Sequence, residues 1–234
     1  MADNKDKKHY ISRAESRQIA RENSKAIRRF EKQKKRRAKP DDYTTQMKDD
    51  NNIIEFDDLH TYFFSDAGTV KAVNGVSFSI PAGSTVGVVG ESGCGKSVTS
   101  LSLMQLVQAP SGQIVSGSIR FKASLFKRDE RGRKIPVYET EIGADGVERV
   151  KLNAKGKKII KKNSLGGNLY EMEDRVVDIA KMPTEAMRSI RGSEISMISQ
   201  EPMTALNPVF TIGNQLDEVG LLHIEGISKK QVKA

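Results

Sequence analysis

Eight consecutive residues constrain the fold of this 234-residue chain more than any other feature. Residues 90–97 match the pattern G-x-x-x-x-G-K-[ST] at every fixed position. A short apolar run, Thr85 to Val89, precedes them, and apolar residues at helical spacing follow from Val98 to Val107. A buried strand, a glycine-rich loop and a helix is the order that a phosphate-binding loop requires. The sequence therefore predicts an α/β fold built around a P-loop.

The residue types of this loop explain how it would hold a nucleotide triphosphate. Glycines let successive backbone N–H groups turn inward, and the following helix adds the partial positive charge of its N-terminus. The lysine would reach the β- and γ-phosphates, and the serine hydroxyl would suit Mg²⁺. The cysteine is interpreted as a small residue of which only the backbone matters, rather than as a redox or catalytic thiol. The expected nucleotide-binding residues are Gly90, Glu91, Ser92, Gly93, Cys94, Gly95, Lys96 and Ser97.

The basic charge of the chain is concentrated at its N-terminus. The formal net charge is +9, and residues 1–40 carry a net charge of +10, so the remainder carries −1. Residues 1–50 therefore predict a basic extension, either helical or disordered and mainly solvated. Contact with anionic lipid headgroups or RNA is the alternative, because residues 34–37 are four successive basic residues.

The remaining sequence, residues 51–234, predicts one domain interrupted by an insertion. Alternating apolar runs from Ile53 to Phe64 and from Val70 to Ile80 predict two antiparallel strands. Residues 122–181 are rich in charge and glycine and predict a polar surface insertion, part of which forms a hairpin or stays mobile. Residues 194–200 predict a second strand that ends in a glutamine, and Ser228 with Gln231 predicts a capping box at the start of a helix.

A second segment narrows the class of P-loop protein. Residues 195–209 read ISMISQEPMTALNPV and closely resemble the Q-loop segment of the ATP-binding subunits of oligopeptide, dipeptide and nickel ABC importers. Residues 70–80, VKAVNGVSFSI, resemble the strand that precedes the P-loop in the same family. The resemblance covers residues 53–121 and 184–231. It implies the P-loop NTPase core of an ABC nucleotide-binding domain with an antiparallel β subdomain, incomplete at the C-terminus.

The resemblance also implies site residues, cofactors and partners. Gln200 would be the catalytic Q-loop glutamine, contacting Mg²⁺ and the attacking water, with Ser97 as the other metal ligand. ATP and Mg²⁺ would be the cofactors, and the candidates for stacking on adenine are Tyr62, Phe63 and Phe64, for each of which packing in the core is the alternative. Transmembrane permease subunits, a second ATP-binding subunit and, indirectly, a substrate-binding protein would be the partners. Nucleic acid is not expected.

The expected location is the cytoplasmic face of the plasma membrane, with peripheral attachment. The single cysteine excludes an internal disulfide, and no run approaches the 18 apolar residues of a membrane helix. The signature segment, the Walker B carboxylates and the switch histidine of the family are not found after Gln200. This chain alone is therefore expected to bind ATP without appreciable hydrolysis. A nucleic-acid-associated ABC-type ATPase and a non-functional fragment remain the alternatives to a peptide importer subunit.

Overall fold

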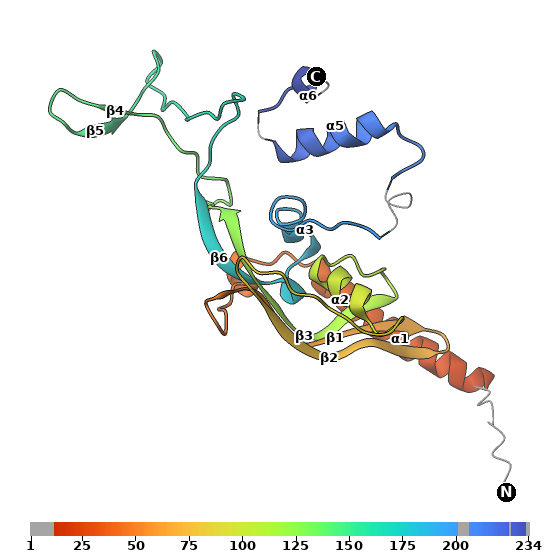
Figure 1. The fold of residues 1–234 in the computed structure, drawn as a ribbon. Helices are drawn as coiled ribbons and strands as arrows, with labels where there is room; N and C mark the ends of the chain where they lie inside the picture. The colour runs from red at the N-terminus through yellow and green to blue at the C-terminus, as the bar shows by residue number, and fades with distance from the viewer. Residues whose placement is uncertain (1–11, 201–205, 225, 233–234) are drawn as a thin grey trace, which may run out of the picture. The chain divides into compact units, whose positions relative to one another are not determined.

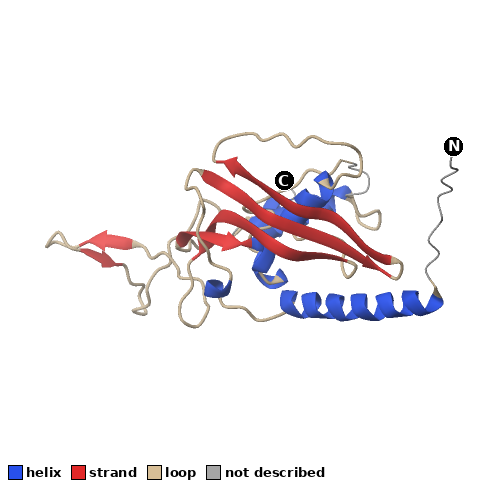
Figure 2. Ribbon diagram, turned by 90° about the horizontal axis from the view of Figure 1, so that it is seen from below, coloured by secondary structure: helices blue, strands red, loops and turns tan. Residues whose placement is uncertain are grey.

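A computed structural model describes residues 12–200, 206–224 and 226–232. The chain forms two compact units. Unit 1 combines residues 1–123 with 175–189, and unit 2 combines residues 124–174 with 190–234. Figures 1 and 2 show the elements of each unit, which are described separately below.

Unit 1 is built on a four-stranded sheet in the order β2-β1-β3-β6. The predicted hairpin is confirmed, because β1 pairs with β2 in antiparallel register, and β3 adds to the other edge of β1. Figure 1 shows β1, β2 and β3 as long curved strands lying side by side. The strands are β1 (Asn52–Ser65), β2 (Gly68–Pro81), β3 (Gly112–Phe126) and β6 (Met172–Asp178).

The core of unit 1 lies against this sheet. Leu59 of β1 and Ile119 of β3 are fully buried, and the rings of Phe56 and Phe78 stack across the β1–β2 pair at 4.4 Å between centroids. The short helices of this unit pack around the sheet and supply further buried side chains such as Met187. These elements are η1 (Pro40–Asp42), α2 (Lys96–Leu103), η2 (Ile179–Lys181) and α3 (Thr184–Met187).

The basic extension contains a helix that docks on the sheet. Helix α1 (Arg13–Lys34) begins with a capping box between Ser12 and Glu15. Phe30 of α1 is buried and stacks on Phe64 of β1, and the Asn23 amide donates to the Ser65 carbonyl at 2.7 Å. Figure 2 shows α1 running alongside the strands. Residues 13–34 thus form a helix that contacts the sheet of unit 1 through the face carrying its few apolar residues, while most of its other side chains are exposed.

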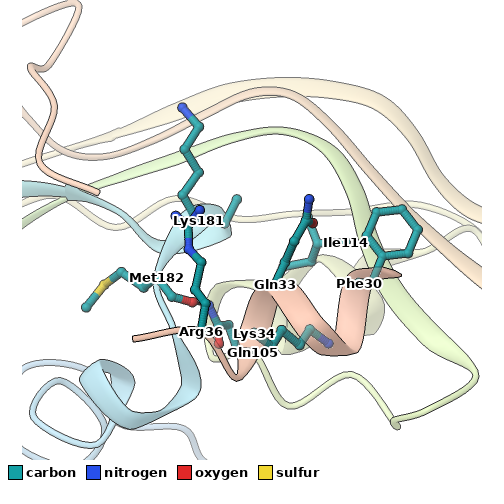
Figure 3. A pocket seen from close by; sticks show the side chains of 9 residues that line it. Phe30, Gln33, Lys34, Arg36, Gln105, Ile114, Lys181 and Met182 are labelled. Carbon is teal, nitrogen blue, oxygen red and sulfur yellow. The ribbon is translucent and has the colours of Figure 1, made fainter. Parts of the chain in front are cut away.

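A cavity of about 190 Å³ lies between the end of α1 and the segment that follows β6 (Figure 3). Phe30 and Ile114 line one side, and Lys181 and Met182 line the other. Burial lowers the pKa of Lys34 at its rim, although the nearby Glu31 carboxylate opposes this shift. Burial is the stronger influence because the ammonium loses hydration that one carboxylate does not replace.

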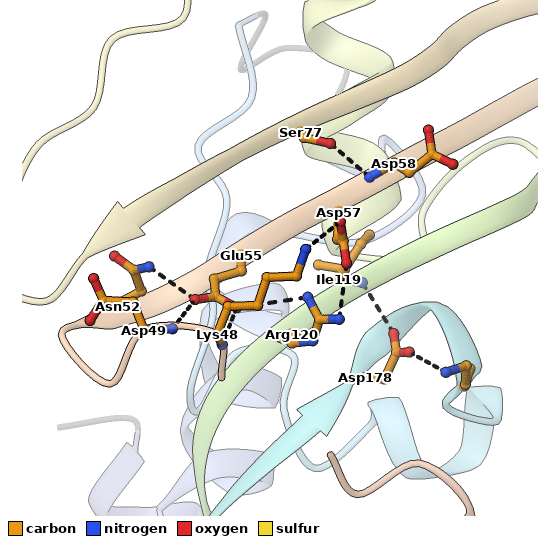
Figure 4. A network of polar contacts seen from close by, with 11 residues as sticks. Lys48, Asp49, Asn52, Glu55, Asp57, Asp58, Ser77, Ile119, Arg120 and Asp178 are labelled. Carbon is orange, nitrogen blue, oxygen red and sulfur yellow. Dashed lines mark hydrogen bonds and ion pairs between the residues drawn. The ribbon is translucent and has the colours of Figure 1, made fainter. Parts of the chain in front are cut away.

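A polar network ties β1 to β3 and to the loop before β1 (Figure 4). Glu55, which is only 4% exposed, accepts hydrogen bonds from the Lys48 and Asp49 N–H groups at 2.8 and 2.9 Å. Arg120 of β3 pairs with Asp57 at 3.0 Å. Burial opposes ionisation of Glu55, but these hydrogen bonds, that from the Asn52 amide and the Arg120 charge together hold its pKa below the ordinary value.

Residues 127–171 of unit 2 form three cyclic sets of backbone hydrogen bonds, and this segment is called the triangular rod. Each set is a closed ring of three residues, in which the backbone N–H of each residue donates to the carbonyl oxygen of another member of the ring. Every bond in the rings measures between 2.8 and 3.0 Å. The rings consist of Lys127, Ile135 and Glu171, then Val137, Lys161 and Leu169, then Glu139, Lys151 and Ile159. A two-stranded ribbon of β4 (Thr140–Ile142) and β5 (Glu148–Val150) extends from the third ring.

Tight turns connect the sides of this triangular rod. In three of them an Asp or Asn side chain accepts hydrogen bonds from the backbone N–H groups two and four residues later in the chain. A glycine three residues after that Asp or Asn has positive φ. Glycine suits that position because other residues rarely adopt positive φ. These turns begin at Asp129, Asn153 and Asn163. The polar insertion of residues 122–181 thus includes an ordered rod, with the stretch from Val147 to Lys162 in hairpin form.

Two helices complete unit 2, α5 (Ile212–His223) and α6 (Lys229–Val232). The predicted capping box is confirmed, because the Gln231 N–H donates to the Ser228 hydroxyl at 3.4 Å and the Ser228 N–H donates to the Gln231 side chain at 3.0 Å. No helix among the described residues is both long enough and apolar enough to span a bilayer.

Two predicted strands do not form. Residues 85–89 are irregular, with Val89 94% exposed, and residues 196–200 are irregular, with Ile198 98% exposed. An apolar segment becomes a strand only when a neighbour hydrogen-bonds to it. Within the described ranges no segment pairs with residues 85–89, and Ile195 makes a single bridge, to Arg191. The helix after the P-loop is also shorter than predicted, because Gln105 adopts a φ of +48° and the helix ends at Leu103.

The core of unit 1 predicts the effect of a truncation. Leu59→Ala should lower the free energy of unfolding by about 2–5 kcal/mol, because it leaves a cavity beneath the sheet. Val70→Ala, at a position on β2 that is 61% exposed, should change it by less than about 0.5 kcal/mol. Chemical denaturation of both variants measures this difference, and equal effects would show that Leu59 does not lie in the core.

The polar network predicts a pH dependence of stability. The folded-state pKa of Glu55 is depressed, so its stabilising contribution is present above the ordinary carboxyl pKa and is lost as pH falls through the folded value. Glu55→Gln should therefore lower stability at pH 7 by roughly 1–3 kcal/mol. It should also flatten the fall in thermal midpoint as the pH drops from about 5 to about 3. Parallel slopes for the two proteins over that range would contradict this role.

Candidate functional site

The loop of residues 90–97 folds around its own lysine. The Lys96 ammonium donates to the carbonyl oxygens of Gly90 and Glu91, each at 2.7 Å, and lies 3.7 Å from the Cys94 sulfur. These contacts hold the cation over the loop, mainly through two main-chain carbonyl oxygens. An anion that displaces the carbonyl oxygens would therefore meet a lysine that is already close to the loop amides.

Glycine is required at one position of this loop, and a second glycine lies close to the Cys94 side chain. Gly95 has a φ of +101°, and a Cβ there would lie 2.4 Å from the Ala72 carbonyl oxygen of β2. A Cβ on Gly90 would lie 2.8 Å from the Cys94 sulfur. The first contact brings the loop against the sheet, and the second lets it close on itself. Cys94 itself is exposed.

Helix α2 starts immediately after Gly95, which caps it without a side chain. The first-turn N–H groups at Lys96 and Ser97 therefore have no side-chain acceptor on the capping residue. Such groups, together with the helix dipole, favour an anion at the helix N-terminus. Ser97 is exposed at this end, so its hydroxyl can reach a ligand bound there.

Buried hydroxyl groups fix α2 to the sheet. Ser102, fully buried, shares a 2.8 Å hydrogen bond with Thr61 of β1, and Thr99 donates to the Gly95 carbonyl at 3.0 Å. The Ser102–Thr61 bond joins α2 to the sheet, and the Thr99 bond lies within the first turn of the helix. The P-loop pattern does not include these residues. In the sequence, these hydroxyl residues are marked only by their spacing, since Thr99 and Ser102 lie three residues apart and so share a face of α2.

The three aromatic candidates of β1 lie in different surroundings. Phe64 is covered by Phe30 of α1, and the Tyr62 hydroxyl donates to the Asn74 side chain at 2.7 Å. Phe63 pairs with Gly112 of β3 and lies two residues from Thr61, in unbroken register with β3. Side chains two residues apart in a strand share a face, so Phe63 lies on the face that contacts α2.

Gln200 belongs to unit 2 and is exposed in an irregular segment, whereas the P-loop belongs to unit 1. Its joint action with Ser97 on Mg²⁺ therefore stays a prediction. Residues 201–205, which follow Gln200 in the segment that resembles the Q-loop segment, lie outside the described residues.

The amino-acid sequence around this site is similar to those of known transport proteins. Residues 73–181 match the family model described as ABC transporter. The oligopeptide transport ATP-binding protein AppD of Bacillus subtilis is 35% identical over 183 residues, which is 78% of this chain and 39% of the relative. The dipeptide transport ATP-binding protein DppD of the same organism is 34% identical over 181 residues, or 77% of this chain and 38% of the relative.

A putative peptide import ATP-binding protein of Brucella abortus is 35% identical over 179 residues, 76% of this chain and 38% of the relative. The chain thus spans about two fifths of the length of these relatives. The matched region contains the glycine-rich loop, α2 and the strand β3. The chain thus contains a region that matches the ABC transporter family model, and most of its length is similar to peptide-transport ATP-binding proteins.

Proposed function

We propose that residues 90–97 bind the triphosphate of MgATP and that the chain supplies this nucleotide site to a peptide-importing ABC transporter. The observation that carries the proposal is the conformation of the loop. It combines a glycine capping α2, a lysine held over the loop by two carbonyl oxygens, and an exposed serine at the helix N-terminus. A nest of main-chain amides with an adjacent cation is the arrangement that phosphate groups require.

Each residue of the loop has a distinct role in this proposal. The amides of residues 91–97 donate to the phosphate oxygens, and the glycines at 90, 93 and 95 leave room for them. Lys96 leaves the carbonyl oxygens of Gly90 and Glu91 and moves to the β- and γ-phosphates. Ser97 would hold Mg²⁺ through its hydroxyl, and Gln200 is the second residue proposed to contact the metal and to orient the attacking water.

The peptide-import role comes from the names of the relatives. AppD and DppD are named for the transport of oligopeptides and dipeptides, and residues 70–80 and 195–209 of this chain resemble their group. Permease subunits and a second ATP-binding subunit are the proposed partners, at the cytoplasmic face of the membrane.

The loop geometry predicts the outcome of removing the lysine. Lys96→Ala should weaken MgATP binding about ten- to a hundredfold, the expected worth of a charged hydrogen bond to phosphate. Lys25→Ala, which removes an exposed lysine from α1, should leave the affinity unchanged. Titration with a fluorescent ATP analogue measures both variants, with circular dichroism as the folding control. Wild-type affinity in Lys96→Ala would refute the proposal.

A metal role for Ser97 predicts a different pattern. Ser97→Ala should weaken binding of MgATP several-fold, yet change little the binding of ATP in the presence of a chelator, because only the metal contact is lost. The same titration with and without Mg²⁺ separates the two effects. An equal loss under both conditions would mean that the hydroxyl binds phosphate rather than metal.

The placement of the aromatic residues predicts which one stacks on adenine. Phe63→Ala should weaken ATP binding more than it weakens binding of tripolyphosphate, because base–aromatic stacking contributes about 1–3 kcal/mol. Phe64→Ala is the matched control, since the Phe64 ring packs on Phe30. Competition titrations with ATP and tripolyphosphate give the comparison. Loss of ATP selectivity in Phe64→Ala alone would assign the base to the other face of the sheet.

A further inference from the structure

The triangular rod, residues 127–171, carries a strongly basic segment that the nucleotide site does not use. Residues 149–170 include seven Lys and Arg residues and no Asp or Glu. Two of the seven have carboxylate partners elsewhere in the rod, since Arg149 pairs with Asp145 and Lys151 lies 3.9 Å from Glu139. In the described part of the chain, the other five form no ion pair and are exposed: Lys155, Lys157, Lys158, Lys161 and Lys162.

The backbone presents these lysines in a fixed arrangement. The Asn153 side chain accepts the N–H groups of Lys155 and Lys157 at 2.9 and 3.0 Å, which fixes the turn that carries them. Lys161 stands in the second ring, where its N–H donates to the Val137 carbonyl at 2.8 Å. Five like charges on an ordered backbone repel one another, and an anionic surface would relieve that repulsion.

Apolar side chains stand beside the lysines. Leu152 immediately precedes the turn at Asn153 and is 55% exposed, and Leu165 lies within the next turn and is 39% exposed. Clustered lysines next to exposed leucines are typical of segments that lie at a membrane surface. The ammonium groups meet anionic headgroups while the leucines enter the region between the headgroups and the acyl chains.

We propose that the triangular rod is a docking surface for anionic phospholipid membranes. Nucleic acid fits the rod less well. Single-stranded nucleic acid is bound by exposed aromatic rings, but Lys158 lies 5.1 Å over the ring of Tyr138, and Lys134 lies 4.9 Å over that of Tyr170. The five charges are all lysines, which act as point charges and suit headgroups without the paired geometry of arginine. The inference does not depend on nucleotide binding.

Vesicle co-sedimentation of the full chain tests this docking. The probes are vesicles of phosphatidylcholine alone and vesicles with 30% phosphatidylserine, at about 0.1 M and 0.5 M salt. The wild-type chain should bind the anionic vesicles only, and less at high salt. Replacing the five lysines by glutamine should lower the partition coefficient at least about tenfold. A circular dichroism spectrum and a thermal midpoint equal to those of the wild-type chain show that the variant is folded.

The matched control removes five exposed basic residues from α1 instead: Arg13, Arg17, Arg21, Lys25 and Arg28, each changed to glutamine. The two variants have the same net charge, so the rod is supported only if the α1 variant keeps its partition coefficient within about twofold. An equal loss in both variants overturns the proposal, as does wild-type partition of the rod variant. The proposal is also overturned if the rod variant loses binding to a 30-nucleotide RNA but keeps binding to the anionic vesicles.

Discussion

The close approach of Gly95 to the Ala72 carbonyl is the constraint on which the candidate site depends. It brings the start of α2 against β2, and only a residue without a side chain allows it. The Ser102–Thr61 hydrogen bond then fixes the other end of the helix to β1. With both ends of α2 held to the sheet, the loop before it must turn sharply, and its amides and Lys96 converge on one small region.

Local patterns in the sequence predicted the parts of the fold that depend on neighbours in sequence. The alternation in residues 53–80 gave the β1–β2 hairpin, the motif at 90–97 gave the start of α2 at Lys96, and Ser228 gave the capping of α6. Segments that need distant partners were predicted less well. Val86 to Val89 and Ile198 have the composition of buried strands, but composition does not supply the neighbouring strand that hydrogen-bonds to them.

The packing of α1 and the tight turns of the triangular rod could both have been predicted from patterns in the sequence. The apolar residues Ile19, Ile27 and Phe30 share one face of α1, which indicates a packed helix. The pattern of Asp or Asn followed three residues later by Gly recurs at 129, 153 and 163, which indicates repeated tight turns. The closed hydrogen-bond rings between those turns join residues as far apart as Lys127 and Glu171, and no local pattern predicts them.

Hydrogen exchange at the P-loop tests the central claim most directly, because the proposed ligands of the phosphates are the backbone amides themselves. Exchange of the amides of residues 91–97 is measured with saturating MgATP, with AMP and without nucleotide. Strong protection of these amides by MgATP, and much weaker protection by AMP, is the predicted result. Binding of MgATP that leaves their exchange unchanged would contradict the account.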